Sequence, residues 1–299
     1  MTALKDSVEA LSIGALMALA RPLIDTREAQ MILAHVLGVS RALLIAHPER
    51  LLDAEQTRGV QSLFARRAAG EPIAYLLGTR EFYGRQFIVS PATLIPRPET
   101  ELIVEQALVR LSSYLMLASR ASASVSSSAL SPHPRVLDLG TGSGAIAVSL
   151  ALECPGAAVV ATDISPDALK IAAENARRLN ADVEFTESNW YANIVDRQFD
   201  LIVANPPYVA GSDEHLFQGD LRYEPQIALT DESTDGLSSI RAIVDGAPAH
   251  LNAGGWLLFE HGYDQAEAAG ELLLKAGFVN LICMNDLAGI ARVAGGQIR

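Results

Sequence analysis

Residues 1–75 carry their apolar side chains at helical spacing. Ala29 and Ile32 follow this period, after Asp25 as a helix cap and before Gly38 as a helix stop. The same period recurs in three further segments, 4–15, 41–45 and 53–70. The pattern therefore predicts a small all-α helical bundle over residues 1–75, in which His35 and His47 are packing or surface residues.

Beyond the bundle, the apolar positions form short runs. Phe82 and Phe87 lie on either side of Gly84 in a strand, turn, strand pattern, which predicts a hairpin within a linker of residues 76–98. From residue 99 onward, continuous apolar runs alternate with helical stretches, as is typical of parallel sheets whose two faces are covered by helices. An α/β domain over residues 99–299 follows from this alternation.

Two segments interrupt the pattern. The proline-rich segment 94–101 is predicted to stay extended up to Pro98, and an amphipathic helix is predicted over 99–111. Arg97 is the single positive charge of this segment; it either pairs with a neighbouring glutamate or faces a ligand pocket. The Ser/Ala-rich segment 112–134 is predicted to be a flexible surface insertion, because it has few apolar side chains to bury.

Charge and composition narrow the class of protein. The first 75 residues hold as many basic as acidic residues, so the net charge of −12 lies in residues 76–299 and disfavours direct binding to nucleic acid. With no long apolar span and no basic leader, we expect a cytoplasmic protein without membrane contact. Cys154 and Cys283 lack metal-ligand spacing and the six histidines are scattered, so we expect reduced thiols and no metal site.

The string Asn205-Pro206-Pro207-Tyr208 follows the apolar run 199–204, which reads as a buried strand. It therefore lies at the carboxyl end of that strand, where open α/β sheets bind ligands. Two prolines end the strand, make the backbone rigid and leave its carbonyls available as acceptors. Asn205 adds a side-chain acceptor and Tyr208 a flat aromatic face, so the string predicts a site for a substrate amine or amide.

A glycine-rich turn forms the second motif. Gly140, Gly142 and Gly144 separate a short buried strand from a helix, and Asp163 ends the next strand, about twenty residues later, where it can hold ribose hydroxyls. Nicotinamide enzymes and S-adenosylmethionine enzymes share this arrangement. Asp138 completes an Asp-x-Gly-x-Gly-x-Gly pattern, and together with the Asn-Pro-Pro-Tyr string it favours S-adenosylmethionine.

With these motifs, the chain resembles the release factor glutamine methyltransferase family (HemK/PrmC). The resemblance runs from the helical bundle to near the C-terminus and includes the segments 80–84, 94–101, 223–229 and 260–262. It implies a Rossmann-like seven-strand S-adenosylmethionine methyltransferase domain, closed by a reversed final hairpin and preceded by a helical bundle that binds the release factor.

The resemblance also implies roles for the cofactor-binding residues. The loop after Asp138 would surround the methionine part of S-adenosylmethionine, Asp163 would hold the ribose and Trp190 would flank the adenine. The residues of this loop are Gly140, Thr141, Gly142, Ser143 and Gly144. Asn189 stands where the family often has Asp, and its carbonyl could still contact the adenine amino group.

The substrate implied is the glutamine of the Gly-Gly-Gln motif in bacterial class I release factors. It would be bound by Asn205, Pro206, Pro207 and Tyr208, with Arg97 nearby, and Asn205 would also touch the cofactor. In this hypothesis the Asn205 side-chain carbonyl and the Pro206 backbone carbonyl accept the two amide N–H bonds, while Tyr208 covers the amide face. These three residues are the predicted catalytic residues.

Three other functions remain as alternatives: an adenine-amino methyltransferase acting on DNA or RNA, an inactive cofactor-binding module, and a nicotinamide oxidoreductase. The acidic charge counts against the first, the intact motifs against the second, and the lack of a hydride-transfer acid or base against the third. The chain itself contains Gly295-Gly296-Gln297, which we predict to be a disordered tail and not a substrate, and Glu260-His261, which we predict to be a structural pair.

Overall fold

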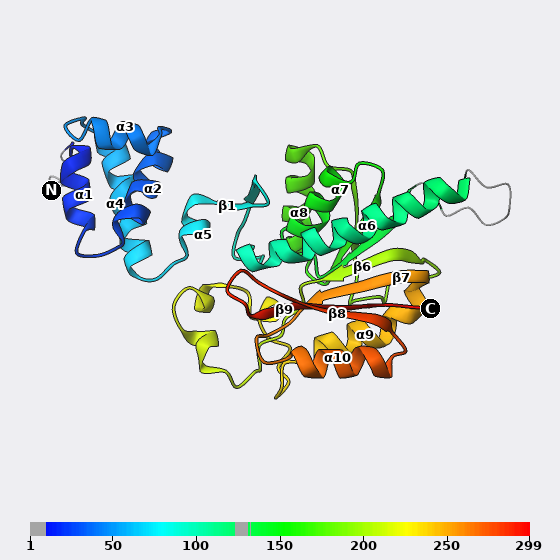
Figure 1. Cartoon of the computed structure of the whole chain (residues 1–299). Helices are drawn as coiled ribbons and strands as arrows, with labels where there is room; N and C mark the ends of the chain where they lie inside the picture. Colours follow the sequence, from blue (N-terminus) through cyan, green and yellow to red (C-terminus); the bar gives the residue numbers. More distant parts are fainter. Residues whose placement is uncertain (1–9, 123–130, 132) are drawn as a thin grey trace. The chain divides into compact units, whose positions relative to one another are not determined.

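The structure, a computed structural model, describes residues 10–122, 131 and 133–299. The chain divides into two compact units, Met1–Thr79 and Arg80–Arg299 (Figure 1). Each unit has its own hydrophobic core.

The first unit is a helical bundle. Its helices are α1 (Ile13–Ala20), α2 (Thr26–Leu37), α3 (Arg41–Ala46), α4 (Ala54–Ala68) and α5 (Ile73–Leu77). The predicted limits of α2 are confirmed: the Asp25 carboxylate caps its first turn, and Gly38 ends it in the left-handed conformation. Of the helix predicted over residues 4–15, residues 10–12 are not helical and α1 begins at Ile13, whereas residues 4–9 lie outside the described residues.

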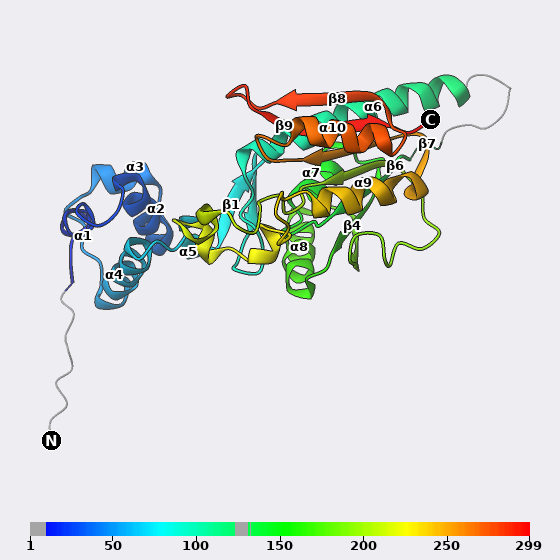
Figure 2. The ribbon, with the colours of Figure 1, turned by 90° about the horizontal axis from the view of Figure 1, so that it is seen from below.

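The second unit is built on a seven-stranded sheet in the order β5-β4-β3-β6-β7-β9-β8 (Figures 1 and 2). The strands are β3 (Arg135–Leu139), β4 (Ala158–Asp163), β5 (Val183–Glu187), β6 (Phe199–Ala204), β7 (Leu251–Glu260), β8 (Val279–Asn285) and β9 (Ala291–Gln297). Neighbours among β3 to β7 pair in parallel, whereas β9 runs antiparallel to both β7 and β8. The predicted seven-strand Rossmann-like fold with a reversed final hairpin is confirmed.

Helices cover both faces of this sheet, as Figure 1 shows. On one face lie α6 (Glu101–Ser122), α7 (Ala145–Glu153) and α8 (Pro166–Leu179), and on the other lie α9 (Ser238–His250) and α10 (Ala266–Lys275). Short 3-10 helices occur at η1 (Pro98–Thr100), η2 (Glu214–Phe217), η3 (Leu221–Tyr223) and η4 (Gln226–Ala228). No helix in the described ranges is both long and apolar enough to cross a membrane.

The hairpin that we predicted inside a linker belongs, from Arg80 onward, to the second unit. It consists of β1 (Thr79–Phe82) and β2 (Arg85–Ile88), and Phe82 and Phe87 are buried in the core of that unit. Asn175 of α8 accepts a hydrogen bond from the Ile88 amide (2.7 Å) and donates to the carbonyls of Ile88 (3.0 Å) and Ser143 (2.9 Å). One buried side chain therefore connects the hairpin to the glycine-rich loop.

The prediction of a flexible insertion from residue 112 is wrong for its first part. Helix α6 continues to Ser122, because Leu115 and Ala118 extend the apolar period of Leu111 by about one turn each. Most of the remaining insertion, residues 123–130 and 132, lies outside the described residues.

The Gly-Gly-Gln sequence near the C-terminus is part of the sheet, so the prediction of a disordered tail is wrong. Gly295 and Gly296 are buried in β9 between β7 and β8, and a Cβ atom at Gly295 would lie 2.4 Å from the carbonyl oxygen of Leu257. The Gln297 side chain donates to the carbonyl of Gly254 (2.8 Å) and accepts from Asn280 (2.8 Å). Glycine is needed here for close strand packing.

Candidate active site

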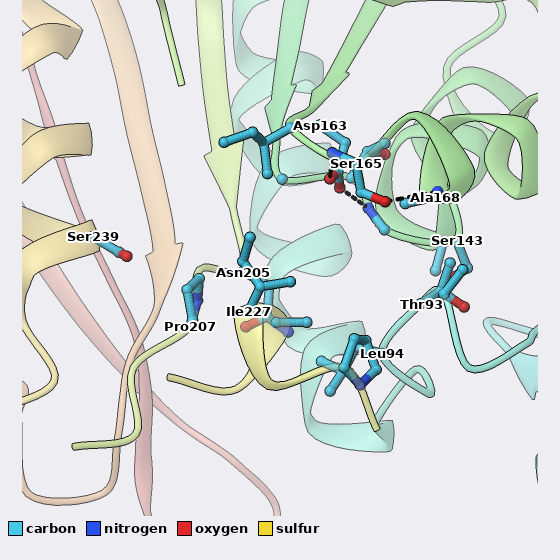
Figure 3. Close-up of a pocket in the computed structure, with 18 of the residues that line it drawn as sticks. Thr93, Leu94, Ser143, Asp163, Ser165, Ala168, Asn205, Pro207, Ile227 and Ser239 are labelled. Atoms are coloured by element: carbon cyan, nitrogen blue, oxygen red, sulfur yellow. Dashed lines mark hydrogen bonds between the residues drawn. The ribbon is translucent and has the colours of Figure 1, made fainter. Parts of the chain in front are cut away.

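A pocket opens at the carboxyl ends of β3, β4 and β6 (Figure 3). It brings together most of the residues that the sequence predicts for cofactor and substrate: Gly140, Thr141, Gly142, Ser143, Asp163, Trp190, Asn205 and Pro207. In Figure 3, Asp163, the last residue of β4, and Asn205, the first residue after β6, border the same cavity. The parallel sheet thus places both sequence motifs at one site.

The glycine-rich loop is held in shape by backbone bonds from β4. The amides of Gly140 and Thr141 both donate to the carbonyl of Thr162, at 2.9 and 2.8 Å. Gly140 and Gly142 have φ angles of 71° and 56°, which glycine adopts at little cost. No atom lies within 4 Å of the place where a Gly142 Cβ would stand, so the backbone there is open to a ligand.

Asp163 supports this loop and also borders the pocket. One carboxylate oxygen accepts from the Gly142 amide (2.8 Å) and the other from the Ser165 amide (2.9 Å), both drawn as dashed lines in Figure 3. Burial raises the pKa of Asp163, while the backbone hydrogen bonds oppose that rise. Each oxygen has a further lone pair, so the carboxylate can still accept from two ribose hydroxyls.

Asp138 lies beneath the loop and not on the pocket wall. Its Oδ2 accepts from the Thr141 hydroxyl (2.7 Å) and from the Ala147 amide (3.2 Å), whereas no described residue bonds its buried Oδ1. Burial raises the pKa of Asp138 to about 7. The carboxyl group therefore orders the loop and the first turn of α7, and its contact with the cofactor stays a prediction.

Gly144 also faces away from the pocket. A Cβ atom at this position would lie 3.1 Å from the Cβ of Ala172, so Gly144 allows α7 and α8 to pack closely. Its φ angle of 81° starts α7 in a conformation that favours glycine. The geometry supports a packing role, and the cofactor contact of Gly144 stays a prediction.

The far end of the pocket is bordered by Ser188, Asn189 and Trp190, after β5. The Trp190 ring packs over the loop, 3.4 Å from the position of a Gly140 Cβ. The Ser188 hydroxyl donates to the Trp190 carbonyl (2.8 Å), which fixes this turn. The flat Trp190 ring lies next in sequence to the exposed side-chain amide of Asn189, and this combination suits a planar base. These residues therefore fit the adenine of S-adenosylmethionine.

At the substrate end, Asn205 is joined to a buried set of polar side chains. Its Nδ2 donates to the Thr100 hydroxyl (3.1 Å), and that hydroxyl donates to Glu260 Oε2 (2.7 Å). Thr100 borders the pocket, and Glu260 lies behind it with 1% of its surface exposed. Sequence reasoning missed Thr100, because threonine in a proline-rich segment has no distinctive chemical pattern.

Tyr208 and Pro206 do not border the pocket in this structure. The Tyr208 hydroxyl donates to Glu260 Oε1 (3.0 Å), and its ring packs against the core between the sheet and α9. Burial, followed by the nearby charge of Glu260, raises the pKa of Tyr208. The predicted covering of a substrate amide by Tyr208 therefore stays a prediction, whereas its anchoring to Glu260 is observed.

Arg97 pairs with Glu224, and not with the neighbouring glutamates that the sequence suggested. The Glu224 side chain is completely buried and also accepts a hydrogen bond from the Ile95 amide (3.0 Å). Arg97 itself is not among the residues that border the pocket. The pair instead connects the proline-rich segment to the wall that contains Pro225 and Ile227.

Replacing Arg97 with alanine is expected to lower the free energy of unfolding by about 3 kcal/mol, because Glu224 would stay buried without its counter-charge. The R97A/E224Q double variant should recover much of this loss. Lys170→Ala, which removes an exposed pair with Asp167, is the matched control and should leave the free energy of unfolding close to that of the wild type. Urea unfolding provides the measurement, and wild-type stability of R97A would contradict this role.

Several pocket residues were not predicted: Thr93, Leu94, Thr100, Ile164, Ile227 and Ser239. Thr93 and Leu94 follow the hairpin, Thr100 ends η1, Ile164 follows Asp163, Ile227 lies in η4, and Ser239 lies in the first turn of α9. Within the described part of the chain, no group of three or more His, Cys, Asp or Glu side chains could hold a metal ion.

Comparison with known families agrees with this geometry. The family described as "Methyltransferase small domain" matches residues 121–220, and the family described as "PrmC N-terminal domain" matches residues 18–78. Among solved structures, a methyltransferase from Pyrococcus furiosus has a TM-score of 0.50 and 18% identity over 78% of this chain and 95% of that one. A human methyltransferase 10 domain containing protein has a TM-score of 0.50 and 16% identity over 80% and 97%.

The curated relatives are more similar and span nearly the whole chain. A release factor glutamine methyltransferase of Bordetella pertussis is 49% identical over 94% of this chain and 97% of its own length. One from Neisseria gonorrhoeae is 47% identical over 90% of this chain and 92% of its own length. The chain belongs to the release factor glutamine methyltransferase family.

Proposed function

We propose that this enzyme transfers the methyl group of S-adenosylmethionine to the side-chain amide nitrogen of the glutamine in the Gly-Gly-Gln motif of class I release factors. The relatives that match nearly the whole chain are named for methylation of a release factor glutamine. The observation that carries the proposal is that Asn205 borders the same pocket as the glycine-rich loop and Asp163. This arrangement supports a site in which the cofactor and a substrate amide would lie side by side.

The described residues fit the proposed cofactor. Asp163 would bind the ribose hydroxyls, the open backbone at Gly142 would allow the methionine part to approach closely, and Trp190 would pack against the adenine. When bound, S-adenosylmethionine supplies a methyl group activated by its positively charged sulfur. The protein's task is therefore to orient the acceptor, which can contribute about 7–11 kcal/mol when the reacting atoms are held near attack distance.

An amide nitrogen is a poor nucleophile because its lone pair is delocalised into the carbonyl. In our proposal the Asn205 side-chain carbonyl and the Pro206 backbone carbonyl each accept a hydrogen bond from one of the two N–H groups of the substrate amide. This arrangement turns the nitrogen toward the methyl donor and stabilises the positive charge that develops on it. The nitrogen becomes acidic once it is alkylated, so the surplus proton can leave to water without a dedicated general base.

The first unit would serve to hold the release factor. It matches the family described as "PrmC N-terminal domain", and it has its own apolar core. Its balanced charge contrasts with the acidic second unit. We propose that it supplies binding energy for the protein substrate while the second unit performs the chemistry.

The proposal is tested by transfer of a radiolabelled methyl group from S-adenosylmethionine to purified class I release factors. We expect label on the wild-type factor and none on a factor in which the Gly-Gly-Gln glutamine is replaced by alanine, with mass spectrometry locating the methyl group. Label on DNA or RNA in place of the factor would indicate the adenine-amino alternative. Cofactor binding without any transfer would indicate an inactive binding module.

A further inference from the structure

Both ends of the Asn-Pro-Pro-Tyr string are connected to one buried carboxylate. Asn205 reaches Glu260 through the Thr100 hydroxyl, at 3.1 and 2.7 Å, and the Tyr208 hydroxyl reaches it directly at 3.0 Å. Glu260 stands at the end of β7, which pairs in parallel with β6, the strand that leads into Asn205. The rigid loop is thus held from behind at its first and last residues.

The chemistry of these groups gives the hydrogen-bond chain a direction. Burial raises the pKa of Glu260, while the hydrogen bonds from Thr100 and Tyr208 oppose that rise and favour the ionised form. In that form the carboxylate only accepts, so both hydroxyls that contact Glu260 donate to it, as their geometry indicates. The Thr100 hydroxyl has a single proton, and once this is given to Glu260 its oxygen can only accept from Asn205. The group that Asn205 turns toward Thr100 must therefore be its NH₂, which leaves Oδ1 as the acceptor available on the pocket side.

We propose that Glu260 and Thr100 are positioning residues that fix the amide orientation of Asn205, so that its Oδ1 always faces the substrate amide. The inference rests on the proposed role of Asn205 as acceptor. If the side-chain amide of Asn205 turned by 180° about its Cβ–Cγ bond, it would present its NH₂ group to a substrate amide that also carries N–H donors. Such a conformer cannot accept and would repel the amide, so even partial reorientation would lower the rate.

Other contacts agree with a loop held in one position. The Gln265 side chain donates to the Tyr208 carbonyl (3.0 Å) and to the Asp235 carbonyl (3.0 Å), and accepts from the Gly262 amide (2.8 Å). A Cβ atom at Gly236 would lie 2.1 Å from the Tyr208 carbonyl oxygen, so this approach requires glycine. Neither Gln265 nor Glu260 borders the pocket. Both therefore act on the loop and not on the substrate.

The test compares Thr100→Val, Thr100→Ser and Glu260→Gln in the full-length enzyme, with a release factor as substrate. T100V keeps the side-chain shape but removes the hydroxyl, and E260Q allows its amide to donate to Thr100, so each should lower kcat by about tenfold. T100S keeps the hydroxyl and should therefore retain most of the wild-type kcat. The KM for the release factor and the Kd for S-adenosylmethionine should stay close to wild type in all three.

A double-mutant cycle separates a shared chain of bonds from two independent effects. If Thr100 and Glu260 act through one chain of hydrogen bonds, the kcat of the T100V/E260Q variant should be about as low as that of either single variant. Independent effects would multiply to about 100-fold. Ser149→Ala removes a buried hydroxyl from α7 that does not border the pocket, and it serves as the matched control, with wild-type kcat expected.

Three results would overturn the inference: wild-type kcat in both T100V and E260Q, equal losses in T100S and T100V, or an additive double-mutant cycle. Thermal unfolding is followed for every variant; if E260Q does not fold, the comparison of T100V with T100S decides alone. Asn205→Ala separates this inference from the proposed function. Transfer that survives N205A contradicts the role of Asn205 itself, whereas loss in N205A with normal T100V and E260Q contradicts only the positioning role.

Discussion

Replacing Asn205 with alanine is expected to lower kcat for methyl transfer to a release factor by about 10²–10³-fold. Asn205 borders the pocket, and its Nδ2 is occupied by Thr100, so the side-chain oxygen is the group that can accept from a substrate amide. Removing it takes away an acceptor whose bond strengthens as positive charge develops on the substrate nitrogen. Binding of S-adenosylmethionine should change little, because Asp163 and the glycine-rich loop are untouched.

Measurement of single-turnover transfer, with cofactor affinity determined separately by calorimetry, checks this expectation. Asn252→Ala is the matched control, since Asn252 bonds Asp200 at the opposite end of the sheet strands and is not a pocket residue. Its transfer rate should equal that of the wild type. Near-normal transfer by N205A would rule out the proposed role of the Asn-Pro-Pro-Tyr string.

Replacing Asp163 with alanine is expected to raise the Kd for S-adenosylmethionine by about 100-fold. The variant would lose the carboxylate oxygens proposed to accept hydrogen bonds from the ribose hydroxyls, and each hydrogen bond to a charged group contributes about 1.5–3 kcal/mol. It would also lose the hydrogen bonds from the Gly142 and Ser165 amides, which shape the loop. The kcat at saturating cofactor should fall much less, because Asp163 does not reach the amide acceptor.

Isothermal titration calorimetry of the cofactor is the appropriate measurement. Asp163→Asn keeps one acceptor oxygen and should have an intermediate affinity. Asp167→Ala removes an exposed carboxylate from the first turn of α8, where it bonds Lys170, and should bind the cofactor like the wild type. An unchanged Kd in D163A would show that the ribose is held by other groups.

The sequence was sufficient for the fold and for the position of the glycine-rich loop and Asp163 at one pocket. Helical and strand periods are local properties, as are the caps at Asp25 and Gly38, and most elements formed where their pattern indicated. The glycine-rich loop and Asp163 lie at adjacent strand ends, so parallel topology alone brings them together. The misjudged end of α6 was obscured by serine-rich composition despite a continuing apolar period.

The tertiary structure decided what surrounds these motifs. Thr100 and Glu260 are 160 residues apart, Asn205 and Thr100 are 105 apart, and Arg97 and Glu224 are 127 apart, and these separations leave no periodic trace in the sequence. The same is true of Gly295-Gly296-Gln297, whose place in β9 depends on the backbones of β7 and β8.

The sequence by itself thus determined the architecture and the methyl donor, and it indicated that Asn205 and Pro207 lie at the carboxyl end of a strand, where the pocket is, because local patterns and strand-end positions specify these features. Only the tertiary structure decided that Tyr208 turns to Glu260, that Arg97 pairs with a buried carboxylate, and that Thr100 separates Asn205 from Glu260. The physical reason is that a hydrogen-bond partner is chosen by distance and direction in space, which residue type and spacing along the chain do not encode.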